Sequence, residues 1–539
     1  MSSADSGAAN SATGGTVREV AWSLLRSFGI DRVFGNPGST EMRMLSGLPA
    51  EIEYVLGLQE ATVVAMADGY AQRTRNAAFV SLHSAAGLGH AMGSVLAAYR
   101  NQTPLIVTAG QQTRAMLPYE PFLYADEAAE LPKPYVKWSV EPARAADVPV
   151  ALARAYHTAM MPPRGPVFVS IPEDDWEEPS APVLPRRVTY SLGADPAAIG
   201  DFADRLARAE RPALVVGPGV DGDGAGEAAV ALAERMRAGV YAAPWSSRCS
   251  FPERHPLFQG FIRASRDAVV EQLAGHDVVL VVGAQAFTYH AHAGGPFLPE
   301  GTSVLHMTDN PRQAFSAVAG DGVVCSPKRG IQALLESLPQ ATRVPPEPVS
   351  RPRAPEPAEP LAAETVLQTL SGLLDEHAPV YEEATSYRRA LRRHLPIARP
   401  GNFYNAFSGG LGWALPAAVG GAIAGPEYRT VCIIGDGSSM YSVQALWTAA
   451  QHRAPLTVIV LNNEEYGALK GFVQRFGGEG FPGADLPGLD LVSEAAGLGC
   501  EASRVESAPR LRSDLQRALA APGPYLLDVR VAPVTGDPL

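Results

Sequence analysis

The sequence is poor in cysteine and contains no long apolar run. Its four cysteines are far apart and form no Cys-x-x-Cys pair, which argues against a zinc site and against a disulfide framework. Cys432 lies within an apolar stretch, where buried packing is expected. This cysteine usage fits a reducing cytoplasm. No apolar run reaches the ~18 residues of a membrane span, so we expect no membrane contact.

Positive charge is also scarce. Lys and Arg number 44 and Asp and Glu number 56, which gives a formal net charge of −12 over 539 residues. Binding along a nucleic-acid backbone needs a basic field, so we expect no nucleic-acid partner. The N-terminal MSSADSGAANSATGG lacks the basic start and apolar core of a signal peptide. We expect residues 1–14 to form a disordered tail.

Two proline-rich stretches, residues 177–187 and 344–360, divide the chain into three blocks. Proline removes backbone donors and favours extended chain, which suits linkers. In every block, short apolar runs such as AAFVSLHS, DVVLVVGA and LTVIVLNN alternate with amphipathic segments such as the predicted helix at residues 59–74. This alternation predicts an α/β fold of three doubly wound parallel-sheet domains. We place them at residues 15–185, 190–343 and 361–535, with a linker at 344–360.

The third block carries the most specific motif. Gly435-Asp436-Gly437-Ser438 follows one apolar strand, and Asn462-Asn463 ends the next. Ligands of such sheets bind at the carboxyl ends of strands. The Asp436 carboxylate, the Asn463 amide oxygen and the Glu465 carbonyl are donors that suit Mg²⁺, and the glycines would let backbone approach a diphosphate. Each motif alone is a common turn; together they resemble the thiamine-diphosphate motif of thiamine-dependent decarboxylases.

Further segments extend this resemblance. VFGNPGS, LQEA, ADGYAQ, LHSAAG and PLIVTAGQQTRAM, followed by RHP, VQALWTAAQ and NNEEYGAL, resemble the benzoylformate decarboxylase family from about Val17 to near the C-terminus. The resemblance implies an N-terminal pyrimidine-binding domain, a central domain and a C-terminal diphosphate- and Mg²⁺-binding domain. It implies thiamine diphosphate and Mg²⁺ as cofactors and decarboxylation of an aryl 2-keto acid. It also implies self-association, commonly as a homotetramer, with active sites between subunits.

Carried over position by position, the resemblance implies roles for individual residues. Glu60 falls on the glutamate that bonds the aminopyrimidine and activates the cofactor. Ser39 falls on the serine that bonds the substrate carboxylate, although alone it could simply cap a helix. His83 and His290 fall on two catalytic histidines, which can move protons near neutral pH. The implied sets are Asp436, Asn463 and Glu465 for the metal; Glu60, Thr385, Ser386, Leu411, Gly435, Asp436, Gly437, Ser438 and Asn463 for the cofactor; and Leu123, Asn405 and Phe472 for the substrate pocket.

The sequence departs from the family pattern near the predicted pocket. Asn405 stands where the family has an aromatic residue, and Tyr387 and Arg388 are bulkier and more basic than the family pattern. His90 and His292 are additional imidazoles. Such polar groups could bond a substrate group or point to solvent. They leave open benzoylformate, a hydroxylated analogue and a more polar 2-keto acid.

Two other functions remain open at this stage. One is another thiamine-diphosphate-dependent lyase or carboligase resembling acetolactate synthase, whose members often carry flavin in the central domain. The glycine-rich segment at residues 215–226 is weak support for flavin. The other is a nucleotide-binding regulatory protein without catalysis, for which the carboxylate at Glu60 and two placed histidines would have little use.

Overall fold

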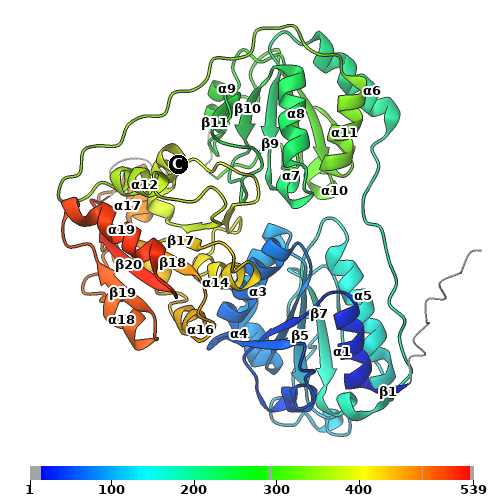
Figure 1. Cartoon of the computed structure of the whole chain (residues 1–539). Coiled ribbons are helices and arrows are strands. Elements are labelled where there is room, and N and C mark those ends of the chain that lie inside the picture. Colours follow the sequence, from blue (N-terminus) through cyan, green and yellow to red (C-terminus); the bar gives the residue numbers. More distant parts are fainter. Residues whose placement is uncertain (1–13, 291–293, 476, 534–539) are drawn as a thin grey trace, which may run out of the picture. The chain divides into compact units, whose positions relative to one another are not determined.

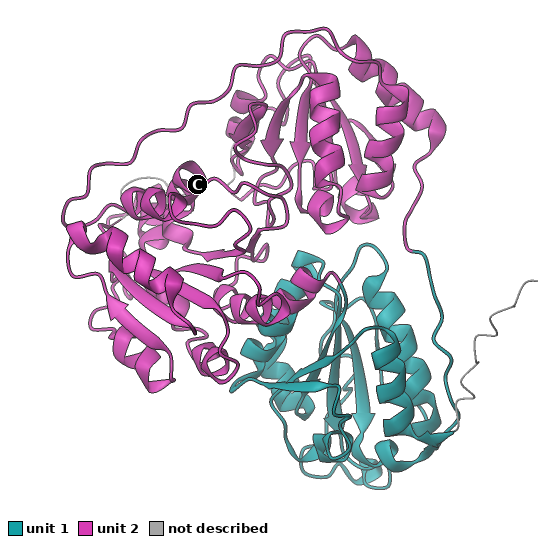
Figure 2. Cartoon of the chain, viewed as in Figure 1, with its two compact units in different colours: residues 1–67, 76–189 teal, residues 68–75, 190–539 magenta. Residues whose placement is uncertain are grey.

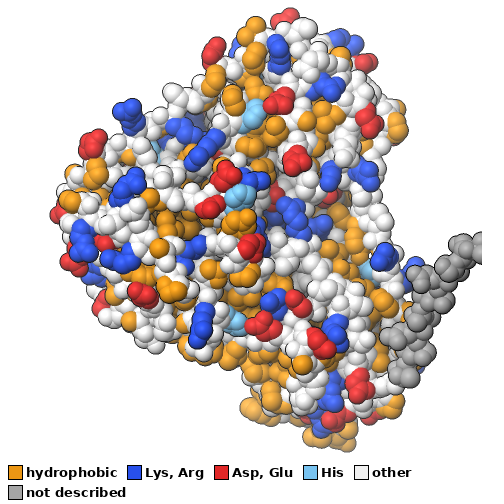
Figure 3. Space-filling view, viewed as in Figure 1, with side chains coloured by type: hydrophobic (Ala, Val, Ile, Leu, Met, Phe, Trp, Pro, Cys, Tyr) orange, Lys and Arg blue, Asp and Glu red, His pale blue; other side chains and the backbone are white. Residues whose placement is uncertain are grey.

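The computed structural model describes residues 14–290, 294–475 and 477–533. The predicted tail lies outside these ranges except for Gly14, and so does His292. The chain divides into unit 1, residues 1–67 and 76–189, and unit 2, residues 68–75 and 190–539 (Figure 2). Across the described ranges, no helix is long and apolar enough to cross a membrane. On the face shown in Figure 3, acidic and basic side chains are interspersed.

Unit 1 contains a six-stranded parallel sheet in the order β3-β2-β4-β5-β7-β6 (Figure 1). Strands β4, β5 and β7 are buried along their whole length, as expected for a parallel sheet covered on both faces. Helix α1 begins with a capping box formed by Thr16 and Glu19. The strands are β2 (Arg32–Gly35), β3 (Glu53–Leu56), β4 (Ala78–Leu82), β5 (Leu105–Gln111), β6 (Ser139–Val140) and β7 (Val167–Pro172), and a short antiparallel pair joins β1 (Gly15–Thr16) to β8 (Pro179–Ser180). The helices are α1 (Val17–Ser27), α2 (Met42–Leu45), α4 (Ser84–Asn101) and α5 (Val148–Met160).

Helix α3 (Glu60–Thr74) confirms the helix predicted at residues 59–74 and begins in unit 1. Its second half belongs to unit 2, where the Asp68 carboxylate accepts a hydrogen bond of 2.7 Å from the Trp413 indole. A Cβ on Gly69 would lie only 2.0 Å from the carbonyl oxygen of Ala417. The glycine of the ADGY sequence therefore lies where the backbone of α3 packs directly against the backbone at Ala417.

The central sheet lies in unit 2 and has the order β11-β10-β9-β12-β13-β14. Numbered along the chain, this is the 3-2-1-4-5-6 order of dinucleotide-binding sheets. Helices α6, α8 and α11 bury one apolar core on one face, and α9 covers a second core. The strands are β9 (Ala213–Val216), β10 (Gly239–Ala242), β11 (Phe258–Phe261), β12 (Val278–Val282), β13 (Ser303–Thr308) and β14 (Asp321–Val324). The helices are α6 (Pro196–Arg208), α7 (Pro218–Gly222), α8 (Gly226–Met236), α9 (Arg266–Gln272), α10 (Pro311–Phe315) and α11 (Pro327–Ser337).

The third sheet, also in unit 2, has the order β16-β15-β17-β18-β20-β19 and is parallel throughout. Helix α14 is apolar around its circumference and almost entirely buried. The strands are β15 (Val380–Glu383), β16 (Phe403–Asn405), β17 (Thr430–Gly435), β18 (Leu456–Asn462), β19 (Glu501–Arg504) and β20 (Tyr525–Arg530). The helices are α12 (Ala363–Ser371), α13 (Arg388–His394), α14 (Ala414–Ala424), α15 (Asp436–Ser439), α16 (Ala445–Gln451), α17 (Gly467–Arg475), α18 (Leu491–Gly497) and α19 (Leu511–Ala520). Three parallel sheets with helical layers confirm the predicted fold class.

Candidate active site

Three adjacent strands of the first sheet end at one edge, and each leads into a predicted site residue. At this edge Gly35 of β2 pairs with Leu56 of β3 and with Ser81 of β4. Because the strands are parallel, the segments that follow them start together. These segments carry Ser39, Glu60 and His83.

His83 is held by a buried carboxylate that sequence reasoning missed. Its Nδ1 lies 3.1 Å from Glu41 Oε2 and 3.1 Å from Thr40 Oγ1. Glu41 is only 3% exposed and also accepts backbone N–H bonds from Gly38 (2.9 Å) and Gly110 (3.0 Å). A carboxylate at Nδ1 favours the tautomer whose proton is on Nδ1, which leaves Nε2 as the other working atom of the ring. The available signal was a glutamate three residues after glycine at a predicted helical turn.

Gly38 packs directly against the His83 ring. A Cβ at this position would lie 2.1 Å from His83 Nδ1, so any side chain would displace the imidazole. Ser39 follows as the exposed first residue of the short turn Ser39–Glu41, whose other two residues are buried, and its hydroxyl is therefore accessible. The NPGS sequence thus combines a close backbone approach with an accessible serine.

Glu60 begins α3 and has polar neighbours on both of its oxygens. Its Oε1 accepts a long hydrogen bond of 3.4 Å from Asn36 Nδ2, and its Oε2 lies 3.2 Å from His90 Nδ1. The Glu60 side chain is 13% exposed, whereas His90 is 67% exposed. One of the two unexpected imidazoles therefore contacts the predicted activating carboxylate.

The predicted metal ligands meet at the matching edge of the third sheet. Strand β17 lies between β15 and β18, with Ile434 beside Glu383 and Gly435 beside Leu461. The Asn463 amide oxygen lies 3.2 Å from Asp436 Oδ1 and 3.0 Å from the carbonyl oxygen of Glu465. Three acceptor oxygens therefore converge; we call them the oxygen triad.

The Tyr387 hydroxyl contacts the end of the Asn463 amide that faces away from the triad. The Tyr387 hydroxyl donates to the Ala532 carbonyl at 2.7 Å, and the Asn463 amide nitrogen lies 3.2 Å from that hydroxyl. Burial raises the pKa of Tyr387 above its usual range, so the hydroxyl keeps its proton. Reversing the amide would place its N–H groups on Asp436 and Glu465, but it would ask one Tyr387 proton to serve two acceptors. The hydroxyl is therefore compatible with the orientation in which the amide oxygen faces the triad, whereas without a cation the reversed amide would hydrogen-bond Asp436 and Glu465.

The triad fits a hard cation. With the amide in this orientation, no proton lies between its three oxygens. Asp436 Oδ2 is also buried without a hydrogen-bond partner among the described residues, and burial raises the pKa of Asp436 to about 6. Unpaired buried oxygens are costly. A carboxylate, an amide and a carbonyl are donors that Mg²⁺ takes, with its remaining positions filled by phosphate and water.

Neighbouring residues of the predicted cofactor set support the same edge. Ser386 Oγ accepts a 2.9 Å hydrogen bond from the Ala468 N–H in the first turn of α17. Ser386 itself lies in a short helical turn, Thr385–Tyr387, which begins at Thr385. A Cβ on Gly437 would lie 2.7 Å from the Tyr466 ring. Gly437 and Ser438 follow Asp436 in the buried start of α15.

Glu383 holds the segment that carries Leu411, and sequence reasoning missed it as well. Its oxygens accept three backbone bonds, from Gly412 (2.6 Å), Trp413 (2.8 Å) and Ala414 (2.8 Å). Burial outweighs these bonds and raises the pKa of Glu383 to about 7. The only signal was a Glu-Glu pair at the end of an otherwise apolar strand.

The predicted substrate-pocket residues have different surroundings. His290 lies beside Phe472, with ring centroids 5.2 Å apart, and beside Trp245 at 5.6 Å. Asn405 is buried and directs its amide to Glu382 at 3.5 Å. Leu123 lies in unit 1, in the segment between β5 and β6, with φ of 67°.

The other two departures from the family pattern have structural partners. The Tyr387 hydroxyl contacts the Asn463 amide and the Ala532 carbonyl. Arg388 donates to Glu382 at 3.0 Å and stacks on Trp245, with 5.0 Å from its Cζ to the ring centroid. Neither side chain needs a substrate group to satisfy it.

The glycine-rich segment of the central domain is used for packing. The Gly219 N–H donates to the Gly283 carbonyl at 2.8 Å. A Cβ on Gly217 would lie 2.2 Å from the Ala284 Cβ. This loop therefore lies against the end of β12 at the switch point of the sheet, where a dinucleotide would otherwise bind.

Comparison with known proteins agrees with this fold. Residues 15–129 match the N-terminal TPP binding domain of thiamine pyrophosphate enzymes, 199–334 the central domain and 383–529 the C-terminal TPP binding domain. These matches define the class as thiamine pyrophosphate enzymes. Benzoylformate decarboxylase of Pseudomonas aeruginosa is 43% identical over 519 residues, which cover 95% of this chain and 98% of that protein. The chain belongs to the benzoylformate decarboxylase family, which confirms the resemblance found in the sequence.

Solved structures agree. The benzoylformate decarboxylase from Polynucleobacter necessarius has a TM-score of 0.95 at 41% identity and covers 97% of this chain and 100% of its own. A thiamine diphosphate-dependent 4-hydroxybenzoylformate decarboxylase from Rhodococcus jostii has a TM-score of 0.94 at 40% identity, covering 96% and 99%. The Escherichia coli acetolactate synthase isozyme 2 large subunit is more distant, at 27% identity over 94% of both chains.

Proposed function

We propose that this enzyme decarboxylates benzoylformate or its 4-hydroxylated analogue, with thiamine diphosphate held through Mg²⁺. The observation that carries the proposal is the oxygen triad of Asp436, Asn463 and Glu465, because with the amide oxygen turned inward a cation would satisfy all three facing acceptors. The two solved relatives named for benzoylformate and 4-hydroxybenzoylformate support the substrate class.

The roles that the family resemblance implies for the protein groups are compatible with their surroundings. When bound, thiamine diphosphate supplies a carbon nucleophile and an electron sink for the loss of CO₂. Glu60 would hold the pyrimidine ring of the cofactor by a hydrogen bond and is the group placed to move a proton there. His83, fixed at Nδ1 by Glu41, presents Nε2 for proton transfer, and His290 beside Phe472 serves as the second imidazole. The accessible Ser39 hydroxyl bonds the substrate carboxylate.

The assembly and compartment belong to the same proposal. We expect a homotetramer with active sites between subunits, located in the cytoplasm. Light scattering coupled to size exclusion measures the mass of the assembly directly. A monomer that is fully active would contradict the intersubunit site.

A substrate panel tests the proposed reaction. The purified protein is incubated with thiamine diphosphate and Mg²⁺, and aldehyde release is followed from benzoylformate, 4-hydroxybenzoylformate, and aliphatic and basic 2-keto acids. Aryl aldehyde should form fastest, and the Glu60→Gln variant serves as the matched control. Acetolactate formation without aldehyde, or flavin absorbance in the pure protein, would instead support a synthase. The absence of aldehyde from every aryl acid in a cofactor-loaded protein would refute the proposal.

A further inference from the structure

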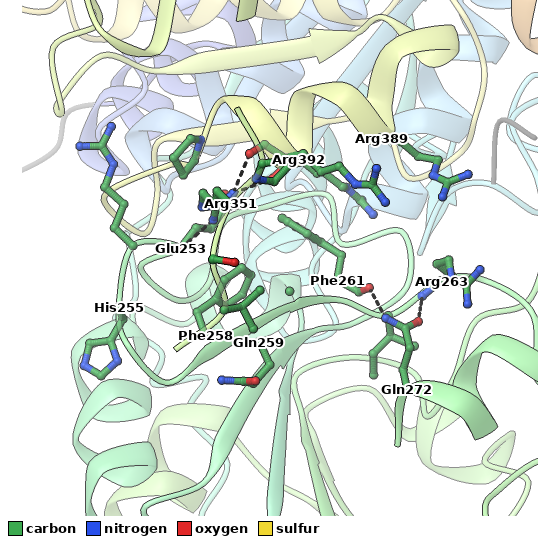
Figure 4. A pocket seen from close by; sticks show the side chains of 18 of the residues that line it. Glu253, His255, Phe258, Gln259, Phe261, Arg263, Gln272, Arg351, Arg389 and Arg392 are labelled. Carbon is green, nitrogen blue, oxygen red and sulfur yellow. Dashed lines mark hydrogen bonds between the residues drawn. The ribbon is translucent and has the colours of Figure 1, made fainter. Parts of the chain in front are cut away.

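A large cavity in unit 2 lies between the edge of the central sheet and α13. It has a volume of about 1110 Å³ and is lined by residues around β11, by the proline-rich segment at 348–352 and by residues of α13. Figure 4 shows Arg389 and Arg392 on one side of it and Phe258 and Gln272 on the other. Seven arginines line it, and Glu253 is the single acidic residue in the lining that the structure describes. We call it the arginine cavity.

Positive charge in the arginine cavity exceeds its compensation. Arg388 pairs with Glu382 and Arg263 with Glu271, one carboxylate each. Arg351 instead donates to neutral carbonyls, those of Arg392 (2.9 Å) and Glu253 (2.8 Å) among them. Burial raises the pKa of the Glu253 carboxyl to about 7, so near neutral pH it is only partly ionised. The rest of the chain contrasts with this cavity, since the whole carries a net charge of −12.

Arg392 is the clearest sign of a missing counter-charge. Its guanidinium stacks over Phe261 with 4.5 Å from Cζ to the ring centroid. Its Nη2 is buried and has no hydrogen-bond partner among the described residues. Burial and repulsion by Arg388 lower the pKa of Arg392 to about 10 and outweigh the opposite effect of Glu382 and Glu253. A buried N–H without an acceptor costs free energy, and the positive charge of this guanidinium favours an anion in the cavity beside it.

We propose that the arginine cavity binds a small molecule carrying a diphosphate or triphosphate. Guanidinium groups fix phosphate oxygens through paired N–H bonds and remain charged when partly buried. The volume matches or exceeds the range of about 300–1,000 Å³ usual for small-molecule sites. The site is separate from the oxygen triad and from the glycine-filled switch point of the central sheet. It is independent of the proposed reaction.

Calorimetry on the holoenzyme tests this proposal. Enzyme saturated with thiamine diphosphate and Mg²⁺ is titrated with pyrophosphate, ADP and adenosine at matched free Mg²⁺. Pyrophosphate and ADP should bind and adenosine should not. Equal affinity for both would identify the diphosphate group as the ligand, and tighter ADP binding would identify a nucleotide. Both outcomes support the proposal.

Variants locate the binding. Arg392→Gln and Arg254→Gln should each weaken pyrophosphate binding about tenfold or more, since a hydrogen bond to a charged group is lost. Arg254 lines the cavity and is exposed, so its substitution leaves folding intact and keeps the test valid if Arg392→Gln folds poorly. Arg512→Gln, on exposed α19 surface outside the lining, is the matched control and should change nothing. No pyrophosphate binding, equal binding by all variants, or binding that releases thiamine diphosphate would each overturn the proposal.

Discussion

The first and third sheets share one strand order and carry different chemistry at the same edge. Numbered along the chain within each sheet, both run 2-1-3-4-6-5. The edge of the first sheet presents Glu60 and His83, the groups that we propose to exchange protons. The corresponding edge of the third presents oxygens with no proton between them, Asp436, Asn463 and the Glu465 carbonyl. Strand order fixes where a ligand can bind, and the side chains at the edge fix what is done to it.

At each edge a buried carboxylate supports the site through protein groups and has no predicted contact with metal, cofactor or substrate. Glu41 fixes an imidazole, and Glu383 fixes the backbone that follows Leu411. Glu41 has a titratable partner, whereas the hydrogen-bond donors to Glu383 are backbone amides. Glu41 should therefore affect proton transfer by His83, whereas Glu383 should affect the shape of the site. The following predictions test the contrast between the edges.

Glu60→Gln should have the largest effect, because the proton-exchanging group of the first edge is removed. Decarboxylation should fall by about 10²-fold or more, the range of general acid–base catalysis. Thiamine diphosphate should still bind, since the oxygen triad is intact. Steady-state rates and equilibrium dialysis of the cofactor measure the two effects. Glu53→Gln, on β3 of the same sheet, is the control, and near-normal turnover by Glu60→Gln would remove the role assigned to this edge.

Glu41→Gln should lower kcat/KM by about 10- to 100-fold, as is typical for partners that orient a functional group. The glutamine side chain keeps one oxygen that can accept a backbone hydrogen bond. It removes the negative charge that faces His83 Nδ1. The pH dependence of kcat/KM should therefore shift, in addition to the fall in its maximum value. A lower rate with an unchanged profile would mean that Glu41 is only structural. Thr40→Val, which removes the weaker neighbour of the ring, should have the smaller effect.

Tyr387→Phe should act on the third edge and leave the first unchanged. Without the hydroxyl, the Asn463 amide can reverse and place its N–H groups toward Asp436 and Glu465. Affinity for Mg²⁺, or for Mn²⁺ followed by electron paramagnetic resonance, should fall about tenfold. The rate at saturating metal and cofactor should remain near that of the parent. Unchanged metal affinity with lower thermal stability would restrict Tyr387 to packing.

Glu253→Gln should have the smallest effect on activity, because Glu253 lies outside both edges. The folded pKa of about 7 is above the usual value of 4.5, so Glu253 stabilises the fold below about pH 4.5, and this contribution is lost as pH rises through about 7. The whole span is worth at most about 3 kcal/mol. The melting temperature of the parent should therefore fall more steeply between about pH 5 and pH 8 than that of the variant. Parallel slopes would show that Glu253 titrates normally.

Much of the site could be predicted because it follows strand ends. Asp436 and Asn463 come directly after two apolar runs, and parallel neighbours bring such ends together. The same reasoning placed His83 after β4 and Glu60 at the start of α3. The roles of Glu41, Glu383 and Tyr387 could not be predicted, because each depends on a partner distant in the sequence, such as Ala532 for the Tyr387 hydroxyl.

The sequence by itself determined the three alternating blocks, the parallel sheets and the positions of the ligand-bearing motifs, because periodicity, glycine and oxygen donors are local properties. Only the tertiary structure decided that the Tyr387 hydroxyl contacts the Asn463 amide, which ring nitrogen of His83 is held, and that arginines from the central edge, the proline-rich segment and α13 surround one cavity. These outcomes depend on hydrogen-bond partners and charges brought together from separate segments, and a hydrogen bond acts only over a few ångströms.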